Sequence, residues 1–215
     1  MLEGLKSCEL CPHRCKVNRL NGKIGRCKAG RNVKIALASV HEFEEPCISG
    51  KKGSGTIFFS NCNLACKFCQ NYEISGEGYG KEITIEELAN IFIKQQEKGV
   101  NNINLVTPTM YVYHIIESIK IAREKGLKIP IIYNTNGYEN IETIKILKGY
   151  IDVYLPDFKY YNNEIAKKYS GIENYFEITS KAIKEMISQV GSTVFDENGI
   201  IQKGVIIRHL ILPNY

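Results

Sequence analysis

The 215-residue sequence contains no apolar run that approaches the roughly 20 residues needed to cross a membrane as a helix. Its beginning, Met1–Leu10, includes the charged residues Glu3, Lys6 and Glu9, so it lacks the continuous apolar stretch of a secretory signal peptide. We therefore expect no membrane partner, and a cytoplasmic location is the default prediction.

The excess of charge of either sign is also small. Lys and Arg total 28 against 23 Asp and Glu, which gives a formal net charge of +5. A surplus this mild and diffuse does not indicate a nucleic-acid-binding protein, so no nucleic acid partner is expected. It suits an acidic protein partner or an anionic small molecule. The hydrophobic content of 44% is ordinary for a globular protein.

Cysteine, in contrast, is abundant, with eight residues. In a reducing compartment these cysteines are better explained as metal ligands than as disulfides. Cys47 stands alone beside Pro46 and is expected to be a structural or incidental thiol. The other seven fall into a first group of four and a second group of three: Cys8, Cys11, Cys15 and Cys27, then Cys62, Cys66 and Cys69.

Short apolar runs alternate with amphipathic stretches in the second part of the chain. The runs are continuous rather than alternating, as expected for strands buried on both faces of a parallel sheet. The predicted strands are Thr56–Ser60, Ile103–Thr107, Ile129–Asn134, Ile151–Leu155 and Val205–Leu212. A turn around Asp196–Gly199 is predicted to join two short strands.

Helical patterns lie between these strands. Thr84 and Glu87 form a capping box that opens a helix, and Gly99 can close it. Asn140 is predicted to cap another helix. The predicted helices after the first span 113–125, 141–148 and 181–190. Repeated strand–helix units predict an α/β fold with a parallel sheet, and five such strands are too few to close an eight-stranded barrel. We therefore predict an open, partial β/α barrel with its active face at the carboxyl ends of the strands.

A stretch rich in Gly and Ser, Ser49–Gly55, is predicted to be a flexible connector between two parts of the chain. Residues 1–50 are Cys-rich and basic, with little periodicity, and are predicted to form a small metal-binding segment. Residues 51–215 are predicted to form the partial barrel.

Cys62, Cys66 and Cys69 follow the first predicted strand with the spacing C-x3-C-x2-C. Three cysteines on one short loop can bind three irons of a [4Fe–4S] cluster and leave the fourth iron open for chemistry. One alternative is a zinc site with a fourth ligand from elsewhere, although zinc knuckles usually pair two short Cys spacings. Metal-free thiols are the other alternative, although neighbouring thiols are liable to oxidation.

With Phe68 just before its last cysteine, this motif resembles that of the radical S-adenosylmethionine superfamily. The surrounding sequence, from His41-Glu42 through Gly53–Phe59 to Gln70–Glu73, is similar to the pyruvate formate-lyase-activating-enzyme-related proteins. The resemblance covers essentially the whole chain and implies an activating-enzyme-like oxidoreductase. The reduced cluster would cleave S-adenosylmethionine to methionine and a 5′-deoxyadenosyl radical, and the radical would abstract hydrogen from a substrate.

The glycine of a glycyl radical enzyme is one such substrate. Two alternatives stay open: a radical enzyme that acts on a small molecule or another residue, and a non-enzymatic iron–sulfur or zinc binding module. The resemblance does not identify a catalytic side chain.

The resemblance also implies cofactor contacts at the strand ends. Phe68 would lie against the adenine, with core packing as the alternative. Thr107 and Thr109 stand where superfamily members often have a Gly-Gly-Glu that receives the methionine amino group. Asn134 or Asn136 could bind the ribose, although Asn-Gly also favours a simple turn.

Asp157 and Lys159 resemble the Asp-x-Lys of activating enzymes, whose lysine pairs with the cofactor carboxylate; a surface salt bridge is the alternative. Arg208 interrupts an apolar run and is expected to contact cofactor or substrate. The family pattern continues with another strand–helix unit after the fifth strand. We therefore expect the barrel, which stops at Leu212–Tyr215, to lack that unit.

Cys8, Cys11, Cys15 and Cys27 supply four thiolates, enough for a closed zinc site or a second iron–sulfur cluster. The spacing does not choose between them. His13 could also ligate but is not needed. The basic residues nearby form a solvated face or dock an acidic electron donor such as flavodoxin or ferredoxin: Arg14, Lys16, Arg19, Lys23, Arg26, Lys28 and Arg31.

Overall fold

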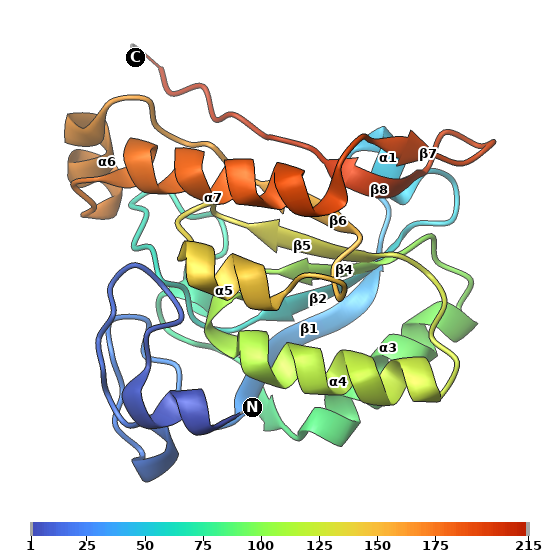
Figure 1. Ribbon diagram of the computed structural model, residues 1–215, viewed down its shortest axis with the longest axis horizontal. Helices are drawn as coiled ribbons and strands as arrows, with labels where there is room; N and C mark the ends of the chain where they lie inside the picture. The colour runs from blue at the N-terminus through green and yellow to red at the C-terminus, as the bar shows by residue number, and fades with distance from the viewer. Residues whose placement is uncertain (1, 214–215) are drawn as a thin grey trace.

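A computed structural model describes residues 2–213 of the chain. Within these residues eight strands form one sheet in the order β3-β1-β2-β4-β5-β6-β8-β7 (Figure 1). The strands are β1 (Val33–His41), β2 (Ser54–Phe59), β3 (Lys81–Ile83), β4 (Ile103–Val106), β5 (Ile131–Thr135), β6 (Val153–Pro156), β7 (Val194–Phe195) and β8 (Ile201–Val205).

The middle of the sheet is parallel and its edges are antiparallel. Strands β2, β4, β5, β6 and β8 run in the same direction. Strand β1 pairs antiparallel with both β2 and β3, and β7 pairs antiparallel with β8. Because the edge strands β3 and β7 do not meet, the sheet stays open, which confirms the predicted partial barrel.

Strand prediction succeeded in the buried centre and failed at the edges. The runs predicted from Thr56, Ile103, Ile129 and Ile151 correspond to β2, β4, β5 and β6 within two residues at each end. Strand β1 was missed because small residues dilute its pattern and most of its side chains are only half-buried.

The predicted strand Val205–Leu212 is wrong in its position. Strand β8 ends where that prediction begins, and the chain beyond it keeps one isolated bridge, from Arg208 to Asp157. The predicted turn at Asp196–Gly199 does join two short strands, β7 and β8. The last residues of the predicted Leu212–Tyr215 end, Asn214 and Tyr215, lie outside the described residues.

The stretch Ser49–Gly55 is not the predicted flexible connector. Ser49 ends a short helix, and Ser54 and Gly55 are buried residues of β2. Strand β1, which precedes this stretch, pairs with β2 and so extends the sheet into the first 50 residues.

Seven α-helices occur in residues 2–213: α1 (Pro46–Ser49), α2 (Tyr72–Ser75), α3 (Ile85–Glu97), α4 (Val112–Glu124), α5 (Ile141–Ile146), α6 (Asn163–Ser170) and α7 (Tyr175–Val190). Three short 3₁₀ helices are η1 (Leu2–Ser7), η2 (Arg19–Asn21) and η3 (Thr109–Tyr111). None of the helices in this range has the length and apolar character to span a bilayer.

The first residues of the helices show which predicted capping interactions are present in the structure. The capping box at α3 is present, with hydrogen bonds in both directions between Thr84 and Glu87. Asn140 precedes α5 as predicted but does not cap it with its side chain. Its amide instead donates to the carbonyl oxygens of Glu9 and Cys11, at 2.6 and 3.2 Å. Helix α7 begins before the predicted 181, and α6 was not predicted.

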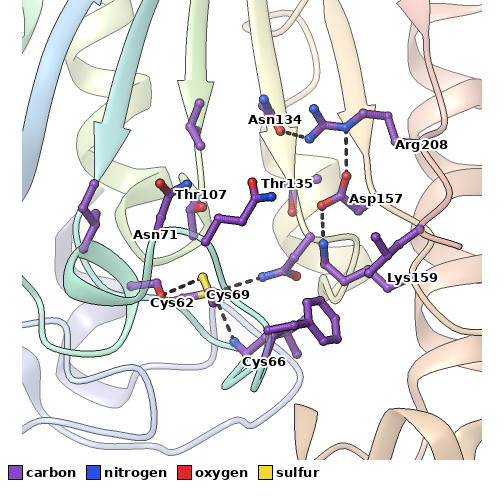
Figure 2. Close-up of a pocket in the computed structure, with 18 of the residues that line it drawn as sticks. Cys62, Cys66, Cys69, Asn71, Thr107, Asn134, Thr135, Asp157, Lys159 and Arg208 are labelled. Atoms are coloured by element: carbon purple, nitrogen blue, oxygen red, sulfur yellow. Dashed lines mark hydrogen bonds and ion pairs between the residues drawn. The ribbon is translucent and has the colours of Figure 1, made fainter. Parts of the chain in front are cut away.

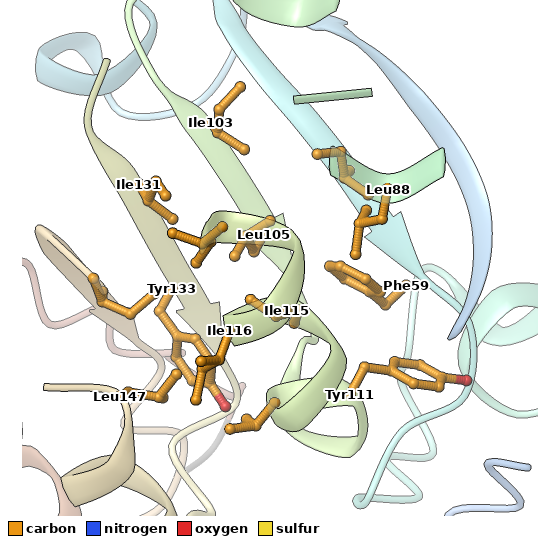
Figure 3. Packing of buried hydrophobic residues seen from close by; sticks show 14 of the residues in the cluster. Phe59, Leu88, Ile103, Leu105, Tyr111, Ile115, Ile116, Ile131, Tyr133 and Leu147 are labelled. Carbon is orange, nitrogen blue, oxygen red and sulfur yellow. The ribbon is translucent and has the colours of Figure 1, made fainter. Parts of the chain in front are cut away.

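The outer face of the sheet carries the main core. Alternate strand residues point to this face, where they pack against α3, α4 and α5 (Figure 3): Phe59, Ile103, Leu105, Ile131 and Tyr133 meet Leu88, Ile115, Ile116 and Leu147. These side chains are essentially inaccessible to solvent, so this layer supplies most of the hydrophobic stabilisation of the fold.

The inner face of the sheet is closed at one end by α1. Ile48 of α1 packs against the inward-facing Ile132, Val153, Leu155 and Ile201. The side chain of Asn102, which precedes β4, donates to the Ile48 carbonyl oxygen at 2.9 Å. Helix α1 therefore fills the amino-terminal end of the half-barrel, and the space at the carboxyl ends of the strands stays open.

Candidate functional site

A pocket of about 570 Å³ lies at the carboxyl ends of the parallel strands (Figure 2). The structure brings ten of the predicted site residues to its wall: Cys62, Cys66, Phe68, Cys69, Thr107, Asn134, Asn136, Asp157, Lys159 and Arg208. Asn134 lies near the end of β5, and the other nine come from the loops after β2, β4, β5, β6 and β8. Five separate segments thus meet at one edge of the sheet, as the parallel topology predicts.

Thr109 is the predicted cofactor contact that the structure does not bring to this pocket. It is fully buried in η3, and its hydroxyl donates to Glu139 at 2.6 Å. Thr107 does line the pocket. Its backbone has φ of +58°, a left-handed conformation that is strained for a β-branched residue. Such strain is often found at functional sites.

The cluster loop, residues 60–71, carries the three pocket cysteines. A different part of the chain contacts each sulfur: Asn136 Nδ2 donates to Cys62 at 3.4 Å, Ser170 Oγ donates to Cys66 at 3.0 Å, and Ser75 Oγ lies 3.1 Å from Cys69. The loop is thereby tied to the turn after β5, to α6 and to α2.

The chemistry of these thiols suits an iron–sulfur cluster. Three soft sulfur donors on one loop face a shared pocket, which is the donor set that iron–sulfur clusters use. Burial raises the pKa of Cys62 to about 12 and also raises that of Cys66, so metal binding would release protons. Among residues 2–213, no three ligand-type side chains lie closely enough together for a single metal ion.

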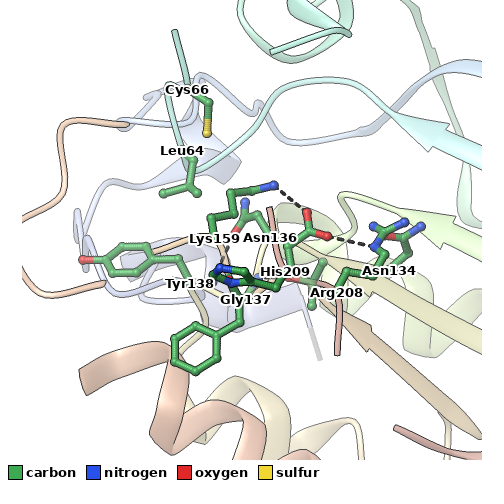
Figure 4. Close-up of polar contacts among 12 residues, drawn as sticks. Leu64, Cys66, Asn134, Asn136, Gly137, Tyr138, Lys159, Arg208 and His209 are labelled. Carbon is green, nitrogen blue, oxygen red and sulfur yellow. Dashed lines mark hydrogen bonds and ion pairs between the residues drawn. The ribbon is translucent and has the colours of Figure 1, made fainter. Parts of the chain in front are cut away.

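Charged side chains form a network on the opposite wall (Figure 2 and Figure 4). Asp157 accepts hydrogen bonds from Lys159 Nζ at 2.6 Å and from Arg208 Nε at 2.8 Å. Arg208 also donates to Asn134 Oδ1 at 2.7 Å. The side chains of Lys159 and Asp157 are only 16% and 21% exposed, so their ion pair is part of the pocket wall rather than a surface pair.

Two acidic residues at this wall were missed in the sequence. Glu44 lines the pocket, and Arg208 Nη1 lies 3.5 Å from a carboxylate oxygen of both Glu44 and Glu45. Burial raises the pKa of Glu44 to about 7, and the charge of Arg208 opposes that rise. Both residues follow β1, the strand that the hydrophobic pattern did not predict, so their approach to the pocket had no sequence signal.

Asn134, near the end of β5, and Asn136, in the turn that follows, have different roles. Asn136 Nδ2 donates to Cys62 and to Asn63 Oδ1, and Asn136 Oδ1 accepts from the Tyr138 backbone N–H. Asn136 therefore forms the turn and holds the cluster loop, whereas Asn134 faces Arg208. At Gly137, with φ of +79°, a Cβ would lie 2.4 Å from the Asp157 carbonyl oxygen, so only glycine fits.

Phe68 packs between aromatic rings beside the pocket. Its ring centroid lies 6.4 Å from that of Tyr160 and 6.2 Å from that of Tyr169. The ring also contributes to the pocket wall. The core-packing and adenine-contact interpretations of Phe68 are therefore compatible with each other.

Glu139 is a buried carboxyl group that the sequence did not reveal. One of its oxygens accepts hydrogen bonds from the hydroxyls of Thr109, Thr135 and Tyr133. The other oxygen is buried without a partner. Burial raises the pKa of Glu139 to about 7.

The earlier cysteines belong to a Cys-rich segment, residues 8–31, that packs beside the cluster loop. His13 Nε2 lies 2.8 Å from the carbonyl oxygen of Asn63, within hydrogen-bonding distance. Arg19 does not belong to the predicted solvated face, because it is 1% exposed. The other six basic residues of that group are exposed.

Comparison with known proteins identifies related sequences. An uncharacterized protein of Methanocaldococcus jannaschii is 35% identical over 98% of this chain and 58% of its own length. The pyruvate formate-lyase-activating enzyme of Clostridium pasteurianum is 25% identical over 83% of this chain and 71% of its own length. A second M. jannaschii protein, provisionally named a glycyl-radical enzyme activating enzyme, is 29% identical over 62% of this chain.

This chain spans 58% and 55% of the length of the two archaeal relatives, so it corresponds to little more than half of each. Residues 56–198, more than half of the chain, match the Radical SAM superfamily. This range contains the C-x3-C-x2-C loop and most of the strands that surround the pocket. On this match, the chain belongs to the radical S-adenosylmethionine superfamily.

Proposed function

We propose that the chain reductively cleaves S-adenosylmethionine with a [4Fe–4S] cluster bound by Cys62, Cys66 and Cys69. Superfamily membership implies both the cluster and S-adenosylmethionine. When bound, the reduced cluster supplies the electron that breaks a carbon–sulfur bond of S-adenosylmethionine and yields a radical able to abstract hydrogen. The observation that carries the proposal is that the three thiols share one pocket with charged and amide side chains from other strand ends.

The residues of this pocket offer complementary groups for S-adenosylmethionine. Lys159 and Arg208 supply positive charge for its carboxylate. The ammonium group of Lys159 acts as a point charge, and the planar guanidinium of Arg208 can donate two parallel hydrogen bonds. The amide of Asn134 can bond ribose hydroxyls, and the Thr107 hydroxyl is the nearest match to the family's amino-group contact. The half-buried Phe68 ring offers a surface for the adenine.

The substrate that we propose is a glycine of a glycyl radical enzyme. Two relatives are named for the activation of such enzymes, pyruvate formate-lyase in one case. The electron donor would be a small acidic protein such as flavodoxin or ferredoxin, and the exposed basic residues of the Cys-rich segment suit such a partner.

Cleavage is tested with anaerobically reconstituted protein, dithionite and S-adenosylmethionine. We expect release of 5′-deoxyadenosine and methionine, measured by chromatography, and a change in the electron paramagnetic resonance spectrum when S-adenosylmethionine is added. Cys62→Ala, Cys66→Ala and Cys69→Ala should each abolish release. Cys47→Ala, which removes a thiol outside both groups, should retain it. A wild-type protein that contains the reduced cluster but releases no 5′-deoxyadenosine would refute the proposal.

The substrate is tested separately by adding pyruvate formate-lyase of C. pasteurianum as a probe. We expect a carbon-centred radical signal on that protein, dependent on S-adenosylmethionine. Release of 5′-deoxyadenosine without such a signal would support the cleavage reaction and contradict this choice of substrate.

A further inference from the structure

Arg19 is a buried cation in the Cys-rich segment. Its guanidinium donates to the carbonyl oxygen of Gly30 at 2.7 and 2.9 Å and to that of Met110 at 2.7 Å. It also lies 5.8 Å from the centroid of the Tyr111 ring. No ion pair within residues 2–213 includes Arg19. Within these residues, a guanidinium that is 1% exposed therefore has no carboxylate to balance it.

A buried charge without a counter-charge is unfavourable, because the protein interior solvates it far less well than water does. The groups beside Arg19 that can become anionic are cysteines. Arg19 Nη1 lies 3.8 Å from Cys8 Sγ, and the charge of Arg19 also acts on Cys27. Neutral thiols give no counter-charge. Four thiolates around a divalent metal ion provide a negative counter-charge, because their summed charge exceeds that of the metal. An iron–sulfur cluster held by four thiolates is also anionic.

The backbone around Cys15 is folded closely about its sulfur atom. A Cβ at Gly25 would lie 2.8 Å from Cys15 Sγ, and the Arg26 backbone N–H donates to the same sulfur at 3.4 Å. Arg14, Lys16 and Lys28 have φ of +41°, +53° and +60°, and each adjoins a cysteine. Side-chain-bearing residues adopt this conformation only where the surrounding structure requires it.

The segment also contacts the cluster loop and its continuation. His13 reaches the Asn63 carbonyl oxygen, next to Cys62, and Lys28 Nζ donates to the Gly76 carbonyl oxygen at 3.1 Å, just after α2. His13 lies between Cys11 and Cys15, and Lys28 follows Cys27. Any centre that fixes these cysteines would therefore also fix one contact to the cluster loop, from His13, and one to the end of α2, from Lys28.

We propose that Cys8, Cys11, Cys15 and Cys27 hold a second metal centre, closed by four thiolates, whose negative charge balances Arg19 and which braces the cluster loop through His13 and the end of α2 through Lys28. The occupant is a thiophilic metal, either one zinc ion or an iron–sulfur cluster. Residues 2–213 contain no group of three or more ligand-type side chains already arranged to hold a metal ion, so this proposal requires the four sulfurs to move together when the metal binds. This proposal goes beyond the radical reaction and does not depend on it.

The test uses a variant of the chain in which Cys62, Cys66 and Cys69 are all changed to alanine, so that the pocket cluster cannot contribute. Zinc, iron and sulfide are counted in this variant after purification and after anaerobic reconstitution. We expect one bound zinc per chain, or iron and sulfide in equal amounts, and the outcome identifies the occupant. A folded variant, judged by circular dichroism, that binds neither would overturn the proposal.

Two further substitutions in that background locate the site. Cys27→Ala should remove the metal, whereas Cys47→Ala should leave it bound. If Cys27→Ala does not fold, a chelator titration of the parent variant replaces it, with cysteine alkylation as the readout. Protection of four thiols that is lost when the metal is stripped supports the site; equal reactivity before and after contradicts it.

The counter-charge is tested by Arg19→Gln and Arg19→Lys in the same background. Competition with a chelator should show metal binding weakened about tenfold in Arg19→Gln and less in Arg19→Lys, because outer contacts of metal ligands commonly contribute that much. Equal affinity in Arg19→Gln and its parent would show that Arg19 is balanced in another way. Since no variant contains the pocket cluster, failure of radical cleavage would not alter these results.

Discussion

At the scale of single residues, the contact between Asn136 and Cys62 makes the clearest prediction about the pocket. Asn136→Ala removes the only side-chain amide that donates to a pocket sulfur in the described chain, and it also removes the bond to Asn63. We expect about tenfold weaker retention of iron after reconstitution, measured as iron per chain during chelator challenge, because a lost outer contact typically lowers metal affinity to this extent.

Asn134→Ala is the matched control for this prediction. Asn134 lies two residues earlier, is similarly buried, and bonds Arg208 rather than a cysteine. We expect this variant to keep its iron and to bind S-adenosylmethionine more weakly. Iron loss of equal size in both variants would indicate general destabilisation of the turn instead of a specific contact to Cys62.

Glu139 predicts a pH dependence of stability. Burial raises its pKa from an ordinary value of 4.5 to about 7 in the folded protein, so between these values the folded state holds a proton that the unfolded state has lost. Its contribution is therefore present in full below pH 4.5 and is lost as the pH rises toward 7, by up to roughly 3 kcal/mol.

Glu139→Gln should remove this loss, because an amide does not ionise in this range while its oxygen still accepts the three hydroxyl bonds. Urea unfolding of both proteins from pH 5 to pH 8 measures the effect. We expect the stability difference to move in favour of the variant as the pH rises. A difference that stays constant across this range would mean that Glu139 titrates normally.

At the scale of elements, α1 shows how a four-residue helix can close one end of the half-barrel. Ile48→Ala removes a fully buried side chain from the inner-face cluster. We expect a loss of about 2–4 kcal/mol in the free energy of unfolding, as for other large-to-small changes in cores. Phe43→Ala, in the loop just before α1 and at a residue 88% exposed, should change stability by less than about 0.5 kcal/mol. Equal effects of the two substitutions in urea unfolding would contradict this packing.

The elements that the sequence predicted are those whose signal is local. The Thr84–Glu87 capping box is a local signal for a helix start, and the continuous apolar runs of β4 and β5 are local signals for buried strands. All three appear within two residues of their expected positions. Strand β1 and helix α1 owe their places to pairing with β2 and to contacts inside the half-barrel. Elements that are held by such tertiary contacts, such as a half-exposed strand or a four-residue helix, show no hydrophobic periodicity in their amino-acid sequence.

The same distinction applies to the candidate site. Cysteine spacing and strand ends predicted the residues that follow β2, β5 and β6. Glu44 escaped prediction, and Arg19 was wrongly assigned to a solvated face, because their importance comes from partners far along the chain, Arg208 in one case and Met110 in the other. Thr109 was predicted by its position after β4, but η3 turns its side chain toward Glu139 instead.

At the scale of the whole molecule, the exposed basic residues of the Cys-rich segment predict how an acidic electron donor associates. Lys23→Glu with Arg26→Glu should lower the rate of cluster reduction by flavodoxin about tenfold at low salt, measured by stopped-flow absorbance, and should weaken its salt dependence. Lys94→Glu with Lys98→Glu, on and just after α3, makes the same change of charge elsewhere.

This control pair should have a much smaller effect, because Lys98 ends α3 on the side of the sheet where β4 begins, away from the pocket. If both pairs slow reduction equally, the effect reports net charge alone. The Cys-rich segment would then not be the docking surface.

The docking of the Cys-rich segment also sets an order of events during synthesis. Its partners lie far along the chain: Arg19 bonds Met110, Asn140 bonds Glu9, and Thr143 bonds Leu10. At ordinary rates of translation the ribosome needs on the order of ten seconds to make the residues between Leu10 and Thr143. During that interval the first four thiols have left the ribosome without the surface that shelters them. The nascent chain is thus exposed to oxidants and metal ions before the barrel exists, and early capture of a metal would protect these thiols until α5 arrives.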